Sequence, residues 1–233
     1  MAERAVVDLR RVLPLADGLD VAKVAAAMNP AMSSWVALRR RVLLEPGQSV
    51  LILGATGNAG GMAVQVAKRL GAGRVVGAGR DPERLAGLRA RGADDTVALL
   101  DDPAHSAQEL AATAAEVDVV LDYLWGVPAA TAMMALLNAR SDRSRALDWI
   151  QIGAMAGPTL ELPSVALRSA NLRLQGNGQG AVSAQAYLAE LPALVDEIEA
   201  GTLAVGTRTF PLADVETIWS APDAPGVRTV LVP

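Results

Sequence analysis

Three glycines in the segment SVLILGATGNAGGMAVQVAKRL, residues 49–70, could hold the phosphates of a nucleotide. Gly54, Gly57 and Gly60 follow a short aliphatic run and precede a helical pattern. Glycine lacks a Cβ, so the backbone can turn tightly there and approach a ligand closely. The first N–H groups of a helix have no intrahelical partners, and the helix dipole favours an anion by about 0.3–1 kcal/mol. The spacing predicts a pyrophosphate cradle, the alternative being a glycine turn without a ligand.

Two arginines lie where the second half of such a site is expected. The strand pattern of residues 74–78 is followed by Gly79 and Arg80, and Arg84 comes one helical turn later. NAD-selective sites carry a carboxylate at the tip of this strand, whereas an arginine accommodates the 2′-phosphate of NADP. Two guanidinium groups suit a phosphate, because charge-assisted bonds contribute about 1.5–3 kcal/mol each. The sequence therefore favours NADP(H) over NAD(H).

Asp81 leaves two interpretations open at this point. Its carboxylate could bind the ribose of NAD, one or two positions late, or it could cap the helix that follows. Pro82 is a favourable first residue of a helix, so the capping role is preferred.

Alternating strand and helix patterns are expected to position these residues. We expect an α/β fold, a Rossmann-type doubly wound parallel sheet with helices on both faces. Its ligand crevice should lie at the carboxyl ends of the strands, rimmed by residues 54–60, 79–80, 122–126 and 153–156. The expected strands are residues 49–53, 74–78, 96–99, 117–121, 146–152 and 172–176, and the later helices are residues 82–91, 103–115, 128–138 and 184–200.

Both ends of the chain fit this sheet poorly. Asp20 should cap a helix over residues 21–28, which Asn29-Pro30 ends, and a second helix should follow over residues 31–41. Its last residues, Arg39 to Arg41, are expected to be a solvated helix end. Residues 205–210 and 227–232 should be extended, with a helix over 212–219 between them. The expected divisions are a connecting segment (1–45), an NADP-binding domain (46–200) and a C-terminal segment (201–233).

Composition excludes several classes of function. The 233 residues carry a net charge of −4 and show no basic stripe interleaved with aromatic residues, which argues against nucleic acid as a partner. The apolar runs are too short for a membrane span, and the N-terminus lacks the pattern of a signal peptide, so we expect a cytoplasmic protein.

Zero cysteines and a single histidine, His105, argue against a zinc site. No GxSxG nucleophile motif occurs, and neither Tyr123 nor Tyr187 is followed four residues later by the lysine of short-chain reductases. The sequence therefore names no catalytic residue and no metal ligand.

An ordered series of segments resembles the medium-chain dehydrogenase/reductase superfamily, in its zinc-independent quinone oxidoreductase branch. The resemblance covers nearly the whole chain. Its segments are AAAMNPAMSSWVAL (25–38), EPGQSVLILGATGNAGGMAVQVAKRLGA (45–72), VVGAGRDPERL (75–85), RGADD (91–95), VDVVLDYLWG (117–126), IQIGAMAG (150–157) and the ending PLADVETIWSAPDAPGVRTVLVP (211–233).

The resemblance implies NADPH-dependent reduction of quinones or enones by hydride transfer, without a metal. It places the pyrophosphate of the cofactor on the backbone of residues 57–60. The 2′-phosphate goes to Gly79, Arg80 and Arg84, and the nicotinamide lies along residues 152–154. Ser33 or Ser34 falls where the family often has a threonine near the cofactor, with helix capping as the alternative. The cofactor-binding residues implied are Gly54, Thr56, Gly57, Asn58, Ala59, Gly60, Gly79, Arg80, Arg84, Ile152, Gly153, Ala154 and Ser34.

Family members begin with a GroES-like domain, and we expect this chain to start just beyond most of it, as a fragment or a naturally shortened form. Residues 2–13 and the last two extended segments resemble pieces that pack on that domain. Two alternatives stay open: a non-catalytic NADPH-binding or scaffolding domain, and an atypical short-chain reductase-like protein. The resemblance also implies a homodimer through an edge strand near residues 171–176, which a symmetric partner would cover.

Overall fold

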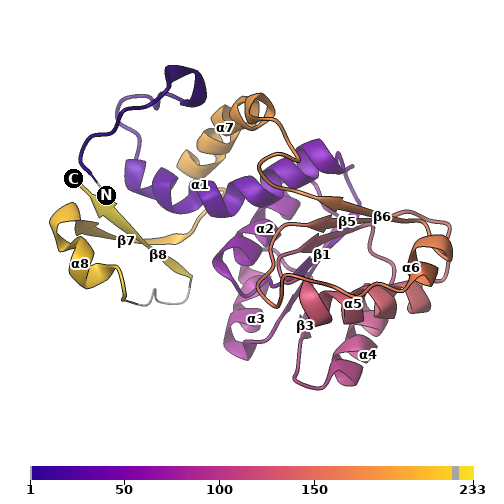
Figure 1. Ribbon diagram of the computed structural model, residues 1–233. Coiled ribbons are helices and arrows are strands. Elements are labelled where there is room, and N and C mark those ends of the chain that lie inside the picture. Colours follow the sequence, from indigo (N-terminus) through magenta and orange to yellow (C-terminus); the bar gives the residue numbers. More distant parts are fainter. Residues whose placement is uncertain (1, 222–225) are drawn as a thin grey trace.

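A six-stranded parallel sheet forms the centre of the molecule (Figure 1). The computed structural model describes residues 2–221 and 226–233; residue 1 and residues 222–225, which belong to the two terminal segments, lie outside it. The strand order β3-β2-β1-β4-β5-β6 is that of a Rossmann fold and confirms the predicted fold class. The strands are β1 (Ser49–Leu53), β2 (Arg74–Gly79), β3 (Asp95–Ala98), β4 (Val119–Asp122), β5 (Leu147–Gln151) and β6 (Leu172–Gly176).

Helices cover both faces of the sheet because the central strands are aliphatic on both sides. Successive residues of β1 point to opposite faces of the sheet, so Val50 belongs to one buried cluster and Leu51 belongs to the other. One cluster lies under α1, α2, α3 and α7, and the other lies under α4, α5 and α6. These helices are α1 (Val21–Val36), α2 (Asn58–Arg69), α3 (Pro82–Leu88), α4 (Pro103–Ala114), α5 (Gly126–Ala139), α6 (Ser164–Arg168) and α7 (Ala184–Glu199).

Helix α1 runs through Pro30, so the predicted break at Asn29-Pro30 is wrong. A proline inside a helix costs about 3 kcal/mol. Here buried contacts with α2 and α7 outweigh that cost, since Ala31 and Trp35 beyond the proline are buried in the core. A five-residue π turn, η2 (Ala37–Arg41), continues the helix.

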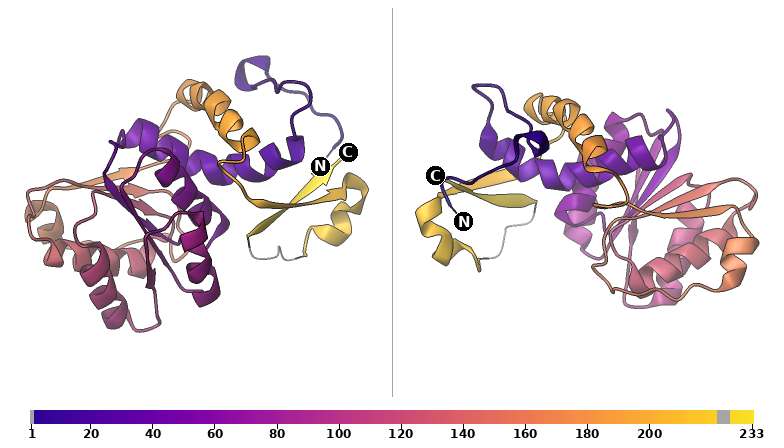
Figure 2. Two further views of the ribbon diagram at one scale, coloured as in Figure 1. Left: turned by 180° about the vertical axis from the view of Figure 1, so that it is seen from behind. Right: turned by 45° about the horizontal axis from the view of Figure 1, so that its top comes forward.

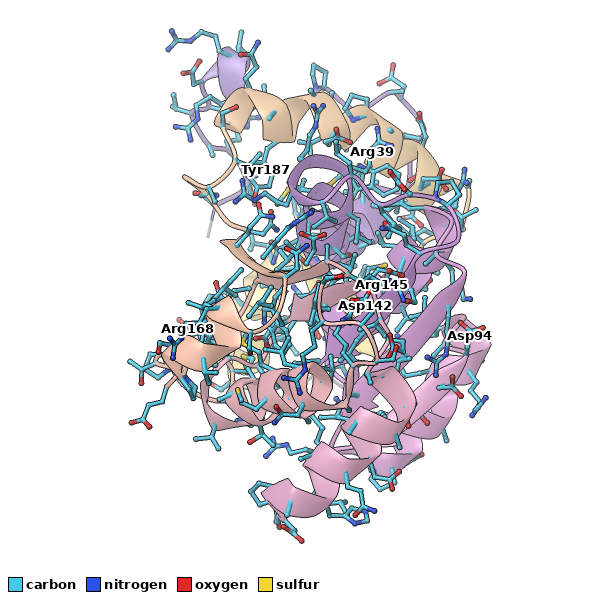
Figure 3. The ribbon with its side chains drawn as sticks, turned by 90° about the vertical axis from the view of Figure 1, so that its right-hand side faces the viewer. Arg39, Asp94, Asp142, Arg145, Arg168 and Tyr187 are labelled. Carbon is cyan, nitrogen blue, oxygen red and sulfur yellow. The ribbon has the colours of Figure 1, made fainter. Side chains whose placement is uncertain are left out.

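Arg39 and Arg40 of η2 are ion-paired although their side chains are 43% exposed, so the predicted solvated helix end also carries a tertiary contact that the sequence did not indicate. Arg39 Nε and Arg40 Nε each lie 2.5 Å from a carboxylate oxygen of Glu190 on α7, and Trp35 Nε1 donates to the same carboxylate at 2.9 Å. Figure 3 shows Arg39 beside α7. The Glu190 side chain is 3% exposed, so these donors compensate a buried charge and fasten α7 to α1.

The C-terminal strands form a second, two-stranded parallel sheet of β7 (Gly206–Pro211) and β8 (Val227–Val232). This sheet lies apart from the six-stranded sheet, near both chain termini (Figure 2). The expected helix over 212–219 is shorter and consists of η4 (Leu212–Asp214) and α8 (Val215–Ile218). At the other end, residues 2–11 are exposed and contain one short turn, η1 (Leu9–Arg11). The remaining turn, η3 (Arg89–Arg91), extends α3.

Two further expectations concern the ends and edges of the fold. Strand β6 is an edge strand, as predicted. The six-stranded sheet lies within residues 46–200, although α1 from the N-terminal segment packs on it; the division into domains stays a prediction. No helix in the described part of the chain is long and apolar enough to cross a membrane.

Glu190→Gln should lower the free energy of unfolding by about 1–3 kcal/mol at pH 7, because the arginines lose their buried partner. Burial alone would raise the pKa of Glu190, but hydrogen bonds from Arg39 and Trp35 outweigh it and hold the pKa below its ordinary value of 4.5. The loss should therefore shrink as the pH falls from 4.5 through the lower pKa of the folded state. Urea unfolding at several pH values measures it, with the exposed Glu83→Gln as control; a loss independent of pH would contradict the ion-pair role.

Candidate functional site

The turn from β1 into α2 brings strand and helix into very close contact. Gly54 has a φ of +86°, a conformation that glycine adopts without strain. Gly57 is the N-cap of α2. A Cβ on Gly60 would lie 2.2 Å from the carbonyl oxygen of Gly54, so no other residue fits there without moving the helix. The glycine spacing thus places the N-terminus of α2 directly beyond the end of β1.

A cavity of about 800 Å³ opens at this N-terminus. It lies at the carboxyl ends of the strands, where the order reverses between β1 and β4, the usual ligand position in such sheets. Its walls come from the β1–α2 turn, the end of β2, the start of α4, and the segments that follow β3, β4 and β5. The lining residues are Gly54, Thr56, Gly57, Asn58, Ala59, Gly60, Gly79, Arg80, Arg84, Leu99, Leu100, Asp101, Pro103, Ser106, Leu110, Tyr123, Leu124, Val127, Pro128, Thr131, Gly153, Met155 and Ala156.

All the residues that the sequence nominates for the cofactor line this cavity, except Ile152, Ala154 and Ser34. Ile152 and Ala154 flank Gly153, which does line it. Ser34 is fully buried inside α1, and its hydroxyl donates to the carbonyl of Ala31 at 3.2 Å. The neighbouring Ser33 hydroxyl instead lies 3.0 Å from the hydroxyl of Tyr123, a residue of the cavity wall.

Arg80 and Arg84 differ in how firmly they are held. Arg84 Nη1 donates to the carbonyl of Thr56 at 3.2 Å, and Arg84 Nε lies 3.3 Å from a carboxylate oxygen of Asp81. Asp81 also accepts from the backbone N–H of Arg84 at 3.0 Å and is the N-cap of α3, as the sequence favours. Arg80 is exposed, and its guanidinium has no acceptor among residues 2–221 and 226–233. The site therefore offers one anchored and one free cation.

Asp122 shapes the loop after β4, a role that sequence reasoning missed. Its side chain is fully buried and accepts from the N–H groups of Leu124 and Trp125 and from the indole of Trp149, at 2.8–3.0 Å. Burial raises the pKa of Asp122, and these donors oppose the rise. They hold Trp125, the N-cap of α5, at a φ of +55°.

Tyr123 is the second residue that the sequence did not single out, although it lies in the expected rim. Its side chain is 7% exposed, and burial raises its pKa to about 12, with the Ser33 hydroxyl opposing the rise. Tyr123 is therefore a neutral hydrogen-bonding group at ordinary pH. Its partner on α1 comes from a segment 90 residues earlier in the chain, which no local pattern indicates.

No metal centre is found among the described residues, where no group of three or more His, Cys, Asp or Glu side chains converges. His105 is exposed on α4, as expected for a surface residue.

Gly60→Ala should destabilise the protein by about 2–4 kcal/mol, since its Cβ would overlap the carbonyl of Gly54 and displace α2. Gly87→Ala is the matched control: it lies in α3, a Cβ there meets nothing within 4 Å, and the helix should be equally or more stable. Urea unfolding measures both variants. Equal stability of the two would show that the close approach of β1 and α2 has no energetic weight.

A model of the family described as zinc-binding dehydrogenase matches residues 59–179, more than half of the chain. A probable NADPH-dependent quinone reductase from Emericella nidulans is 34% identical over 94% of the chain. The chain spans 63% of the length of that relative.

Solved quinone oxidoreductases have the same fold. One from Pseudomonas syringae pv. tomato is 25% identical, with a TM-score of 0.73 over 95% of this chain and 67% of that one. Another, from Thermus thermophilus, studied alone and in complex with NADPH, is 27% identical, with a TM-score of 0.67 over 89% of this chain and 64% of that one.

These matches contradict the alternative of an atypical short-chain reductase-like protein. They agree with the strand order of the sheet and with the position of the cavity. The chain belongs to the zinc-binding dehydrogenase family, in the quinone oxidoreductase-like branch of the medium-chain dehydrogenase/reductase superfamily.

Proposed function

We propose that this chain binds NADP(H) in the cavity at the end of β1 and contributes that site to a metal-independent reduction of quinones or enones. The observation that carries the proposal is the joint position of the α2 N-terminus and the free guanidinium of Arg80 on one cavity wall. A dinucleotide with a 2′-phosphate has anionic groups for both.

The pyrophosphate would lie against the backbone of Gly57, Asn58, Ala59 and Gly60. Gly57 is the N-cap of α2, and its N–H already donates to the carbonyl of Gly54 at 3.1 Å. The N–H groups of the first turn, at Asn58, Ala59 and Gly60, have no intrahelical acceptors. Gly57 is exposed and has no side chain, so an anion can approach the start of the helix there. Gly54 and Thr56 complete this wall of the cavity.

The 2′-phosphate would lie at Gly79, Arg80 and Arg84. Apolar residues of the same cavity lining, among them Leu99, Leu110 and Pro128, offer contacts for the adenine ring. The lining thus offers apolar contacts for the base and guanidinium donors for the phosphate.

The nicotinamide would lie along Ile152, Gly153 and Ala154. Gly153 is tightly packed, since a Cβ there would meet the carbonyl of Tyr123 at 2.7 Å. Bound NADPH would supply the hydride. The chain's own contribution is to hold the ring at the end of β5 and to exclude water on the side of Tyr123 and Ser33. Ser34 would act through the packing of α1.

Three further features belong to this proposal. Independence from zinc is supported by a sequence without cysteine and with a single histidine. A cytoplasmic location also belongs to the proposal, and cell fractionation would test it. A homodimer through β6 is supported by the free backbone edge of that strand and by the exposed Leu174 upon it. Sedimentation at micromolar concentration tests the dimer, and a monomer would count against it.

A non-catalytic NADPH-binding domain is the second candidate. It is supported by the exposure of Met155, 84% exposed at the nicotinamide end of the cavity, since an open site controls water and substrate poorly.

Arg80→Ala should weaken NADPH binding at least about tenfold and leave NADH binding nearly unchanged, because only NADPH carries the phosphate that the guanidinium contacts. Titration calorimetry with both cofactors measures the difference. Arg168→Ala changes an exposed arginine of α6 (Figure 3) that does not line the cavity; it is the control and should change neither affinity. Equal losses for both cofactors would refute the phosphate role.

The enzyme and the binding domain differ in turnover. We expect the chain to oxidise NADPH with 1,4-benzoquinone or a simple enone above the rate without protein, because hydride transfer needs the cofactor and acceptor held together. Absorbance at the NADPH band measures it. Tight binding without such turnover would favour the non-catalytic candidate for this chain.

A further inference from the structure

The side chain of Thr56 closes the space beside Gly79. Thr56 lies in the β1–α2 turn and Gly79 ends β2, and both line the cavity. A Cβ on Gly79 would lie 2.5 Å from Thr56 Cγ2 and 2.7 Å from Thr56 Oγ1. Both distances are shorter than real Cβ contacts allow. Any side chain at position 79 therefore needs Thr56 to move.

We infer that Thr56 is a specificity-determining residue, which excludes a ribose-binding carboxylate from position 79 and offers its hydroxyl to the 2′-phosphate. The inference rests on the proposed function, since it concerns the choice between NADP and NAD in the same cavity. Position 79 is where an NAD-selective site carries its acidic residue. The glycine there is thus enforced by a neighbour, in addition to being compatible with the phosphate.

Thr56 cannot move aside easily, because the turn around it is tied to β2. The N–H groups of Gly54 and Ala55 both donate to the carbonyl of Ala78 at 2.9 Å. The carbonyl of Thr56 accepts from Arg84 at 3.2 Å. Rotation about χ1 leaves at least one of the methyl and hydroxyl groups in the two positions near Gly79, and Thr56 Cβ itself would remain 3.1 Å from a Cβ at position 79.

The hydroxyl of Thr56 is available to a ligand. It has no hydrogen-bond partner in the described part of the chain, and the residue is partly exposed on the cavity wall that also carries Arg80 and Arg84. A phosphate at Gly79 could accept from this hydroxyl and from both guanidinium groups. NAD has a ribose hydroxyl in place of that phosphate and gains less from the same donors.

Asp81 does not supply the missing carboxylate. It is engaged with the backbone N–H and the guanidinium of Arg84, so turning it toward a ribose would uncap α3. Among the described residues of the cavity wall, a carboxylate for the ribose of NAD would therefore have to come from position 79, where Thr56 blocks a side chain.

The steric part of the inference is tested by Gly79→Asp, alone and combined with Thr56→Ala. Gly79→Asp alone should lower Tm by about 5 °C and gain no affinity for NAD⁺. The combined variant should recover most of that Tm and bind NAD⁺ at least about tenfold more tightly than Gly79→Asp does. Gly178→Asp adds the same charge where a Cβ meets nothing within 4 Å, and serves as control.

The hydroxyl is tested by Thr56→Val, which keeps the bulk and removes the donor. NADP⁺ binding should weaken about fivefold or more while NAD⁺ binding stays unchanged, with Thr159→Ala, an exposed threonine after β5, as control. Titration calorimetry and thermal unfolding give both readouts.

Different results separate the two proposals. Gly79→Asp that gains NAD⁺ affinity at unchanged Tm would overturn the steric role, and so would a combined variant no better than Gly79→Asp. Failure of the unmodified protein to bind either dinucleotide would overturn the proposed function. The Tm coupling between positions 56 and 79 would still be measurable in that case, because it needs no ligand.

Discussion

The close approach of β1 and α2 is the constraint on which the rest of the structure depends. With only a hydrogen atom on Gly60, the first turn of α2 rests on the carbonyl of Gly54. Two N–H groups of the turn between β1 and α2 donate to Ala78 at the end of β2. One compact turn thus fixes the distance from sheet to helix and joins the two strands that border the cavity. The N–H groups at the start of α2 and the hydroxyl of Thr56, which are proposed for the dinucleotide phosphates, are placed by these contacts.

The two arginines at the site differ in how firmly their side chains are held. Arg84 is held by Asp81 and by the Thr56 carbonyl, so little side-chain entropy is left for a ligand to remove. Arg80 keeps its freedom and its charge exposed. A phosphate bound here would meet one cation already in place and would order only the second. Preorganisation of this kind favours affinity, and the remaining mobility allows the ligand to enter.

Local sequence patterns were sufficient for the strands, for most helices and for the Asp81 cap, because each depends on residues close in the chain. They failed where distant segments meet. Pro30 is tolerated because α1 packs against α2 and α7, and Arg39 is paired because Glu190 lies across the same interface. The contact between Tyr123 and Ser33 likewise joins the end of β4 to α1. In each case a contact between segments that are distant in the sequence decides the structure, and the local pattern alone does not indicate it.

Cofactor binding and hydride transfer make different demands on this chain. The groups proposed for phosphate binding lie on the turn from β1 into α2, in the first turn of α2, at the end of β2 and in α3, so they all belong to the six-stranded sheet and its helices. Orienting a second substrate needs a second wall, and the exposed Met155 of the cavity lining is an apolar surface suited to contact one. In the proposed function, an open nicotinamide site would admit water, so that the cover of this end of the cavity would set the rate of reduction, while Thr56 and the arginines would set which dinucleotide is bound.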